Sequence, residues 1–194
     1  MSVYTRLTKE ELEQLLYLYD IGKFVDIEGI SEGITNSNYY LTTSLNKYIL
    51  TIFEEPNLNL NYAIELMDLL STNRIPCPIP VKSKDGKCVL NFKDKPLSIF
   101  TLLPGKTITK KTPSEMMCMQ IGETLAKMHL HSKKHKAHYV GLRDIEWFKK
   151  TATKLNPVLK PYEINIINNE LENLSYCLGK NLPSGVIHSD LFRD

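Results

Sequence analysis

The sequence has few cysteines, and their spacing excludes the chemistry that cysteines usually signal. Of its 194 residues only four are cysteine, and no two of them form a C-x-x-C pair. Zinc knuckles and dithiol redox motifs need closely spaced cysteines, so neither motif is present. We expect reduced, mostly buried thiols at the four positions, which are Cys77, Cys88, Cys118 and Cys177.

Long apolar runs are also missing. No stretch of eighteen or more apolar residues occurs, although a helix needs about that length to cross a bilayer. The N-terminal segment MSVYTRLTKEELEQ is too polar for a secretory signal. With 42% hydrophobic and 24% charged residues, the composition is that of an ordinary globular protein. We therefore expect a cytoplasmic protein without a membrane partner.

The net charge is small, but the charged residues are unevenly distributed along the chain. The formal net charge is +2, yet residues 71–160 hold 18 of the 24 Lys and Arg side chains and only 6 of the 22 acidic ones. A basic stretch attracts phosphate-bearing ligands, although it is more often only a solvated surface. This one lacks interleaved aromatic residues and any recognisable nucleic-acid-binding motif, so we expect no nucleic acid partner.

Hydrophobic periodicity predicts an α+β lobe in the first half of the chain. Thr8 to Glu11 has the capping-box form that begins a helix, and Gly22 is a plausible stop. Short runs rich in β-branched and aromatic residues predict strands, with one helix among them. We expect a five-stranded antiparallel sheet, with a meander at 24–30, 38–43 and 47–53, a helix at 58–73, and strands at 87–92 and 97–103.

Helices dominate the second half of the chain. A second capping box at Thr112–Glu115, with proline at the first helical position, predicts a helix that ends near His129. Apolar spacing predicts two more helices, at 145–153 and at 167–178. The boundary between the two lobes is expected near residues 103–112.

The strongest chemical signal is the tripeptide His188-Ser189-Asp190, which follows the apolar pair Val186-Ile187. It matches the opening of the kinase catalytic loop, H-x-D-x-x-x-x-N. Phosphoryl transfer to an alcohol needs a carboxylate that accepts the hydroxyl proton and aims the oxygen at the γ-phosphorus. We assign this role to Asp190, and we expect His188 to brace the loop by hydrogen bonds. A chance H-x-D at the end of a strand is the alternative.

The small polar link from Glu32 to Asn38 is a second, weaker signal. Gly33 permits close approach of the backbone to phosphate oxygens, and Asn and Ser side chains add donors. The link is neither a G-x-G-x-x-G loop nor a P-loop, so an ordinary hairpin turn is the alternative. Its position ahead of an H-x-D motif favours phosphate binding.

Four histidines within ten residues suggest a metal site, but their surroundings argue against one. No cysteine or carboxylate lies among them, three lysines do, and their spacing matches no known zinc motif. We therefore expect no metal at this cluster, which consists of His129, His131, His135 and His138.

Several stretches together resemble the superfamily of aminoglycoside phosphotransferases and choline kinases. They are the order of the N-terminal elements, the Leu102–Gly105 crossover, the Gly122–His129 helix and the Val186–Phe192 loop. Within this superfamily the sequence is most similar to bacterial homoserine kinases of the protein-kinase-like type. The stretches that carry this narrower resemblance are Tyr19–Gly22 with Glu32–Tyr39, Pro76–Val81, and Leu182–Phe192.

The resemblance implies a protein-kinase-like fold, with an N-terminal nucleotide-binding lobe at 1–104 and part of a helical lobe at 105–194. It also implies ATP- and Mg²⁺-dependent phosphorylation of the L-homoserine hydroxyl, which gives O-phosphohomoserine for threonine biosynthesis. Asp190 then corresponds to the catalytic-loop aspartate. The phosphate-covering loop would correspond to Gly33, Asn36, Ser37 and Asn38. The helical glutamate would correspond to Glu65, and the adenine hinge to Leu102 and Leu103.

The sequence departs from this pattern at two places. Thr51 stands where the third strand of a kinase carries its phosphate-anchoring lysine, and we expect the nearby Lys47 to point in a different direction. The magnesium-binding asparagine would fall just after Asp194. We therefore expect a chain truncated inside the catalytic loop, whose activity by itself is an open question, and a second chain that supplies the missing lobe is a candidate partner.

Two alternatives to homoserine phosphorylation stay open from the residues alone. One is a kinase for another small alcohol, such as an aminoglycoside, choline or methylthioribose. The other is a non-catalytic remnant of a split gene.

Overall fold

The computed structural model describes residues 3–31, 35–55, 59–105, 113–133, 135, 144–178, 180 and 185–191. The chain divides into two compact units, one made of Met1–His135 with Val186–Asp194 and the other of Lys136–Gly185. The predicted lobe boundary between residues 104 and 105 stays a prediction.

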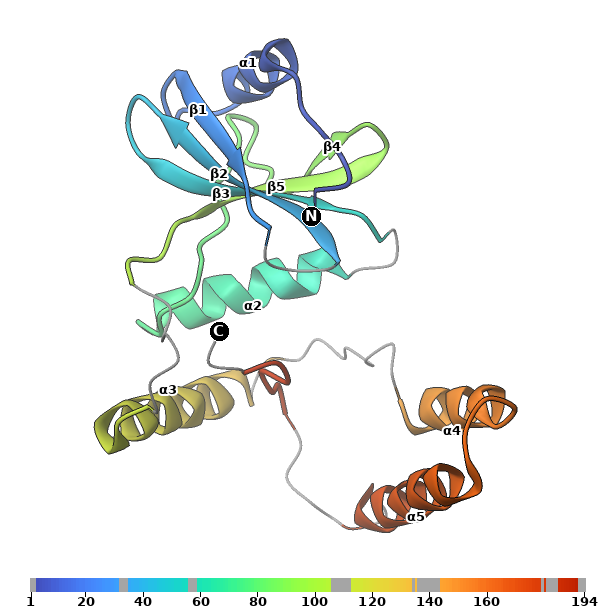
Figure 1. Cartoon of the computed structure of the whole chain (residues 1–194). Coiled ribbons are helices and arrows are strands. Elements are labelled where there is room, and N and C mark those ends of the chain that lie inside the picture. The colour runs from blue at the N-terminus through green and yellow to red at the C-terminus, as the bar shows by residue number, and fades with distance from the viewer. Residues whose placement is uncertain are drawn as a thin grey trace. The chain divides into compact units, whose positions relative to one another are not determined.

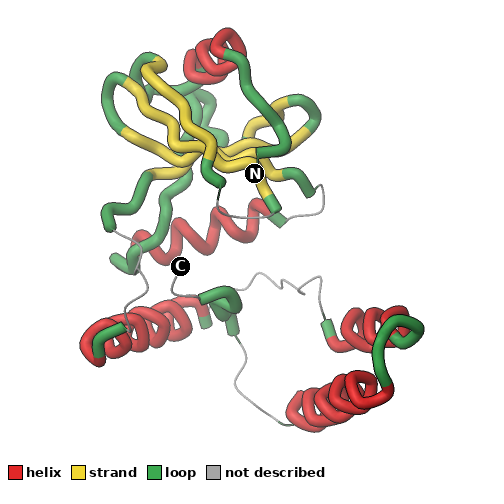
Figure 2. Tube along the Cα trace, in the orientation of Figure 1, coloured by secondary structure: helices red, strands yellow, loops and turns green. Residues whose placement is uncertain are grey.

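Among the described residues, five antiparallel strands form a single sheet in the order β1-β2-β3-β5-β4 (Figures 1 and 2). The predicted five-stranded sheet is thus confirmed. Its strands are β1 (Phe24–Gly29), β2 (Asn36–Thr43), β3 (Lys47–Phe53), β4 (Leu90–Phe92) and β5 (Lys95–Thr101). Strand β4 begins later than the predicted Lys87, because Lys87 closes a turn in which its carbonyl accepts from the Ser83 N–H at 2.9 Å.

Helix α1 (Lys9–Tyr17) begins where the sequence predicted. The Thr8 hydroxyl accepts from the Glu11 N–H at 3.2 Å, and the Glu11 carboxylate accepts from the Thr8 N–H at 2.8 Å, which completes the capping box. Each large apolar side chain that leaves water contributes roughly 1.5–3 kcal/mol. The side chains that α1 buries in the main core are Leu12, Leu15 and Leu16.

Strand pairing decides which residues share a face of the sheet. Directly paired residues of antiparallel strands point to the same side, and successive residues point to opposite sides. The face toward α1 carries the core residues Tyr39, Leu50 and Ile99. The other face carries the row Asn38, Thr51 and Ser98, which pair directly across β2, β3 and β5.

Two helices of the first unit pack on each other through a small apolar cluster. Helix α2 (Leu60–Thr72) contributes Leu70, and helix α3 (Glu115–Ser132) contributes Met128. Figure 1 shows α1 and α2 on opposite sides of the sheet. The face that carries Asn38 is therefore the face on the α2 side.

The start of α3 differs from the prediction. Ser114, not Thr112, is the N-cap, because its hydroxyl accepts from the Met117 N–H at 3.2 Å and leaves Pro113 outside the helix. Thr112 lies outside the described residues. The helix also runs three residues beyond the predicted end at His129, to Ser132.

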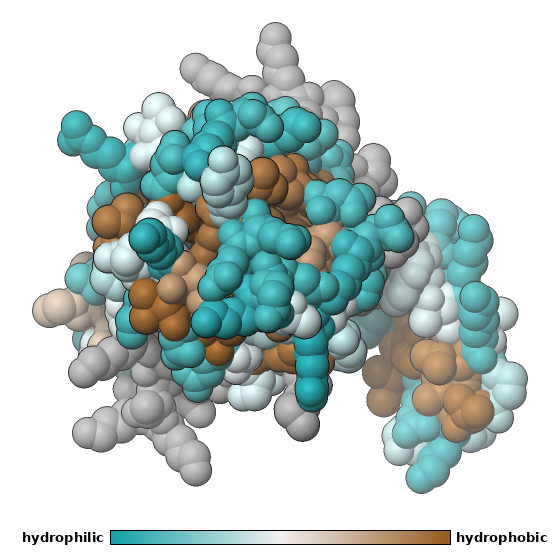
Figure 3. Space-filling view, turned by 90° about the horizontal axis from the view of Figure 1, so that it is seen from above, coloured by the Kyte–Doolittle hydropathy of each residue, from teal (hydrophilic) through white to brown (hydrophobic). Residues whose placement is uncertain are grey.

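The second unit consists of helices α4 (Ile145–Leu155) and α5 (Pro161–Leu178), which pack against each other. Asp144 caps α4 by accepting from the Trp147 N–H at 2.7 Å. Within the described part of these helices no residue is buried, so much apolar surface is exposed on this unit (Figure 3).

The four cysteines are free thiols, as expected, but none of them is buried. Cys77 and Cys88 are half-buried, and Cys118 and Cys177 are exposed. The two exposed thiols lie on α3 and α5, whose described residues are mostly exposed. The expectation of mostly buried thiols is therefore wrong.

Candidate active site

The segment that carries Asp190 is irregular and contains a local hydrogen bond. The Asp190 N–H donates to Nδ1 of His188 at 3.3 Å, and Ser189 between them has φ +64°, in the left-handed region that side chains rarely adopt. All three residues are exposed. The hydrogen bond thus links the backbone of Asp190 to the side chain of His188, and Asp190 itself is accessible to a ligand.

The predicted phosphate-covering link is divided between two faces of the sheet. Gly33 lies outside the described residues. Asn36 and Asn38 are two residues apart on β2, so they share the face on the α2 side, whereas Ser37 points toward α1. The structure therefore brings Asn36 and Asn38 together and separates Ser37 from them.

Ser37 is fully buried and bonded to the N-terminal segment. Its Oγ accepts from the backbone N–H groups of Tyr4 at 2.8 Å and Thr5 at 3.0 Å, and it donates to Oε1 of Glu54 at 2.5 Å. A phosphate contact through this hydroxyl would break these bonds. The side chain of Ser37 holds the N-terminal segment on the sheet.

Glu54 is the ionised centre of this network. Its other carboxylate oxygen accepts from Lys95 Nζ and from the Thr5 hydroxyl. Burial alone would raise the pKa of Glu54, but the hydrogen bonds from Lys95, Ser37 and Thr5 outweigh it and hold the pKa below its ordinary value. Lys95 is therefore committed to a partner on the α1 side.

Thr51 occupies the place where the resemblance expects a lysine. Its hydroxyl donates to Oδ1 of Asn38 at 2.8 Å, and Ser98 lies beside it on β5. Strand alternation puts Lys47 on the same face of the sheet as Thr51, so the expectation that Lys47 points in a different direction is wrong. Lys47 is nevertheless four residues from Thr51 along β3, which is about 14 Å. Sequence reasoning missed the Asn38–Thr51 pair and Ser98, because strand register is not visible in one sequence.

The other predicted nucleotide contacts lie at separate places in the first unit. Glu65 is exposed on α2, and no described Lys or Arg forms an ion pair with it. Leu102 and Leu103 follow directly after β5 and are exposed, at 39% and 44%. They are accessible to a ligand at the end of the strand.

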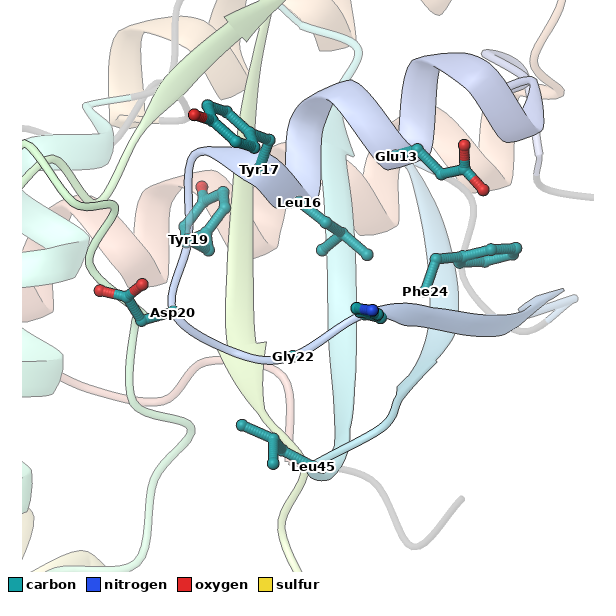
Figure 4. Close-up of a pocket in the computed structure, with 9 residues that line it drawn as sticks. Glu13, Leu16, Tyr17, Tyr19, Asp20, Gly22, Phe24 and Leu45 are labelled. Atoms are coloured by element: carbon teal, nitrogen blue, oxygen red, sulfur yellow. The ribbon is translucent and has the colours of Figure 1, made fainter.

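A hollow of about 610 Å³ lies at the end of α1 (Figure 4). Figure 4 shows it between α1, the link to β1 and the β2–β3 turn, where Tyr17, Phe24 and Leu45 line it. Tyr19 also lines it, and burial, with a smaller contribution from Cys88, raises the pKa of the Tyr19 phenol to about 12. None of the predicted site residues that the structure describes lines this hollow, which lies on the α1 side of the sheet.

Neither a metal cluster nor a membrane-spanning helix occurs in the part of the chain that the structure describes. No three His, Cys, Asp or Glu side chains gather there in a way that could hold a metal ion. No described helix combines the length and the apolar character needed to cross a bilayer.

Comparison with known proteins identifies the relatives of this chain. The model of the phosphotransferase enzyme family matches residues 26–194. The homoserine kinase of Methylobacillus flagellatus is 39% identical over all of this chain and 60% of its own length. The homoserine kinase of Neisseria meningitidis serogroup B is 37% identical over all of this chain and 63% of its own length. The chain thus spans about 60% of the length of these curated relatives.

A solved structure shares the fold. The crystal structure of a spectinomycin phosphotransferase in complex with ADP and spectinomycin aligns with a TM-score of 0.70 at 12% identity. The alignment covers 97% of this chain and 64% of the other. The five-stranded lobe with its following helices is therefore the kinase-like fold that the sequence predicted.

Proposed function

Since the chain belongs to the phosphotransferase enzyme family, we propose that it is part of a homoserine kinase. Such an enzyme transfers the γ-phosphate of ATP to the side-chain hydroxyl of L-homoserine and yields O-phosphohomoserine, a precursor of threonine. The proposal of homoserine as the substrate rests on the 39% identity, over the whole chain, to the homoserine kinase of Methylobacillus flagellatus. ATP as co-substrate agrees with a cytoplasmic location.

Asp190 is the proposed proton acceptor. Its carboxylate takes the proton of the homoserine hydroxyl while the oxygen bonds to the γ-phosphorus and the bond from that phosphorus to ADP breaks. The Asp190 N–H donates to Nδ1 of His188, so His188 is a positioning residue that holds the backbone of Asp190. Exposure of Asp190 leaves room for the acceptor alcohol.

The sheet unit is the proposed nucleotide-binding part, within residues 1–104. The backbone after β5, at Leu102 and Leu103, would hold adenine, and the link that contains Gly33 would cover the phosphates. Asn36 and Asn38 support this role because they share the face of the sheet on the α2 side. Glu65 is the weakest member of the set, since the strand that would supply its lysine partner carries Thr51.

The described residues do not form a magnesium site by themselves. A divalent cation bound with ATP neutralises phosphate charge in this family of reactions. The described residues contain no group of three metal-ligating side chains, so we assign no ligand set to this chain. ATP with Mg²⁺ is the proposed co-substrate, and no step above depends on a metal contact.

Catalysis by this family uses more polypeptide than these 194 residues. This chain matches 60% of the length of the Methylobacillus flagellatus kinase, so about 40% of that relative is unmatched. We propose that this remainder, as a continuation or as a second chain, packs on apolar surface such as that of α4 and α5, where Phe148 and Leu174 are exposed. Apolar surface of this kind is often an interaction site.

The test measures product directly. The chain is incubated with ATP, Mg²⁺ and L-homoserine, alone and with the part of the Methylobacillus flagellatus kinase that it does not match, and O-phosphohomoserine is followed by ³¹P NMR. We expect product with the added part, and a loss of at least about 100-fold for Asp190→Asn. Faster turnover of choline or spectinomycin would overturn the substrate, and equal turnover by Asp190→Asn would overturn the role of Asp190.

A further inference from the structure

The sheet face on the α2 side changes from apolar to polar along the strands. One row across β2, β3 and β5 consists of Tyr40, Ile49 and Phe100, and the next row consists of Asn38, Thr51 and Ser98. Because two residues separate the rows on each strand, they lie about 7 Å apart. One side of the sheet thus presents an aromatic and aliphatic strip beside a strip of neutral hydrogen-bonding groups.

The two rows lie in the same order as the base and the phosphates of the proposed nucleotide. Strand β5 runs from Lys95 to Thr101, so the apolar row lies nearer to Leu102, where adenine is proposed to bind. The polar row lies toward the start of β2, which follows the proposed phosphate-covering link. A nucleotide is flat and largely apolar at its base and charged at its phosphates, so its chemistry matches this order.

The polar row has unused hydrogen-bonding capacity. Thr51 donates to Oδ1 of Asn38 and so fixes the amide, whose Nδ2 donates to none of the described residues. Ser98 is 1% exposed, and its hydroxyl has no partner in the described part of the chain. The buried Oδ1 of Asn36 also has no partner there. A buried polar group without a partner is costly, so Ser98 in this row, and Asn36 two residues before Asn38 on the same face, point to a ligand or its bound water there.

The row also lacks a cation. Lys95 pairs with Glu54 on the other face, and Lys47 is about 14 Å from Thr51 along β3. The lysine that anchors phosphates in other kinases therefore has no substitute on this row among the described residues.

We propose that the Asn38–Thr51 pair, with Ser98 beside it, replaces that lysine and anchors the phosphate chain of ATP through neutral hydrogen bonds. The inference rests on the proposed function, because it takes a nucleotide as the ligand of this face. Nδ2 of Asn38 donates to a phosphate oxygen, and Thr51 holds the amide in the orientation that permits this. Thr51 is a positioning residue, and Asn38 is the contact.

The test compares ligands with and without phosphates. Isothermal titration measures the dissociation constants of ATP and adenosine, both with Mg²⁺, for the parent chain and for Thr51→Val and Asn38→Asp. Thr51→Val removes the hydroxyl at constant shape, and Asn38→Asp keeps an acceptor for Thr51 but loses the amide donor. We expect each variant to weaken ATP binding about tenfold and to change adenosine binding less than about twofold.

Two controls separate binding from folding. Thr51→Ser keeps the hydroxyl and should retain ATP affinity within about threefold, and Asn91→Ala removes an exposed amide on the edge strand β4 and should have no effect. Unchanged ATP affinity in both test variants, or equal losses for ATP and adenosine, would overturn the inference alone. A parent chain that binds neither ligand, alone or with the unmatched part of the Methylobacillus flagellatus kinase present, would overturn the proposed function, and the inference with it.

Discussion

The hydroxyl of Ser37 donates to the carboxylate of Glu54 at 2.5 Å. The oxygen of the same hydroxyl accepts hydrogen bonds from two backbone N–H groups. The bond joins the start of β2 to the residue that follows β3 and ties both to the N-terminal segment. We expect Ser37→Ala to lower the free energy of unfolding by about 1–3 kcal/mol, because two N–H groups lose their acceptor. Urea unfolding measures the change, and an effect below about 0.5 kcal/mol would show that water replaces the hydroxyl.

The Glu54 carboxylate should make this stability depend on pH. Its pKa lies below the ordinary value of 4.5 in the folded chain. A depressed pKa contributes stability that is present above the ordinary pKa and is lost as the pH falls through the folded pKa. We expect Glu54→Gln to destabilise the chain at pH 7 and to destabilise it less at pH 3.5, measured by urea unfolding at both values. A difference from the parent that grows on acidification would contradict this sign.

The turn at Gly22 should not accept a side chain. Gly22 has φ +90°, and an added Cβ would lie 2.6 Å from the Ser44 Oγ and 2.9 Å from the Leu45 Cγ. We expect Gly22→Ala to cost roughly 1–3 kcal/mol in the free energy of unfolding, from backbone strain and from the clash. Thermal and urea unfolding measure the loss.

Gly86 supplies the matched control for that substitution. It has φ +77°, but nothing lies within 4 Å of the Cβ position. Gly86→Ala should therefore show the strain alone, about 1 kcal/mol. If both glycine variants lost the same stability, the close approach at Ser44 would have no energetic weight.

The Tyr19 hydroxyl should be dispensable for folding at neutral pH. Tyr19 is 3% exposed, and its hydroxyl has no hydrogen-bond partner among the described residues. We expect Tyr19→Phe to leave the free energy of unfolding at pH 7 unchanged or slightly higher. A loss above about 1 kcal/mol in urea unfolding would show that the hydroxyl has a partner in solution.

The same residue gives a prediction at alkaline pH. The pKa of Tyr19 is raised from 10.0 to about 12, first by burial. A raised pKa contributes stability that is present below the unfolded value and is lost as the pH rises through the folded value. The parent should therefore lose stability relative to Tyr19→Phe between pH 10 and 12, measured by urea unfolding across that range.

The left-handed backbone conformation of Ser189 should limit which residue can follow His188. Ser189 has φ +64°, where glycine is unstrained and a β-branched side chain is most strained. We expect Ser189→Gly to retain homoserine phosphorylation within about threefold, and Ser189→Val to lose at least about tenfold in kcat with little change in the KM for ATP. Equal activity of the glycine and valine variants would show that this backbone conformation changes when substrates bind.

Local sequence rules predicted most elements of the fold. The Thr8–Glu11 capping box, the β-branched and aromatic runs of the second and third strands and the apolar spacing at 167–178 each depend on a few neighbouring residues. The start of α3 was misplaced because Thr112 and Ser114 both have N-cap chemistry, and local sequence does not choose between them.

The candidate site also has one part that the local sequence predicted and one part that it did not. The His188-Ser189-Asp190 motif is contiguous, so the sequence by itself determined the proposed proton acceptor and, through resemblance, the kinase-like fold. Register across β2, β3 and β5 joins residues 13 and 47 positions apart along the chain, so only the tertiary structure placed Asn38, Thr51 and Ser98 in one row. It also turned Ser37 to the opposite face, because the side-chain period of a strand is two residues and pairing fixes which face each residue takes.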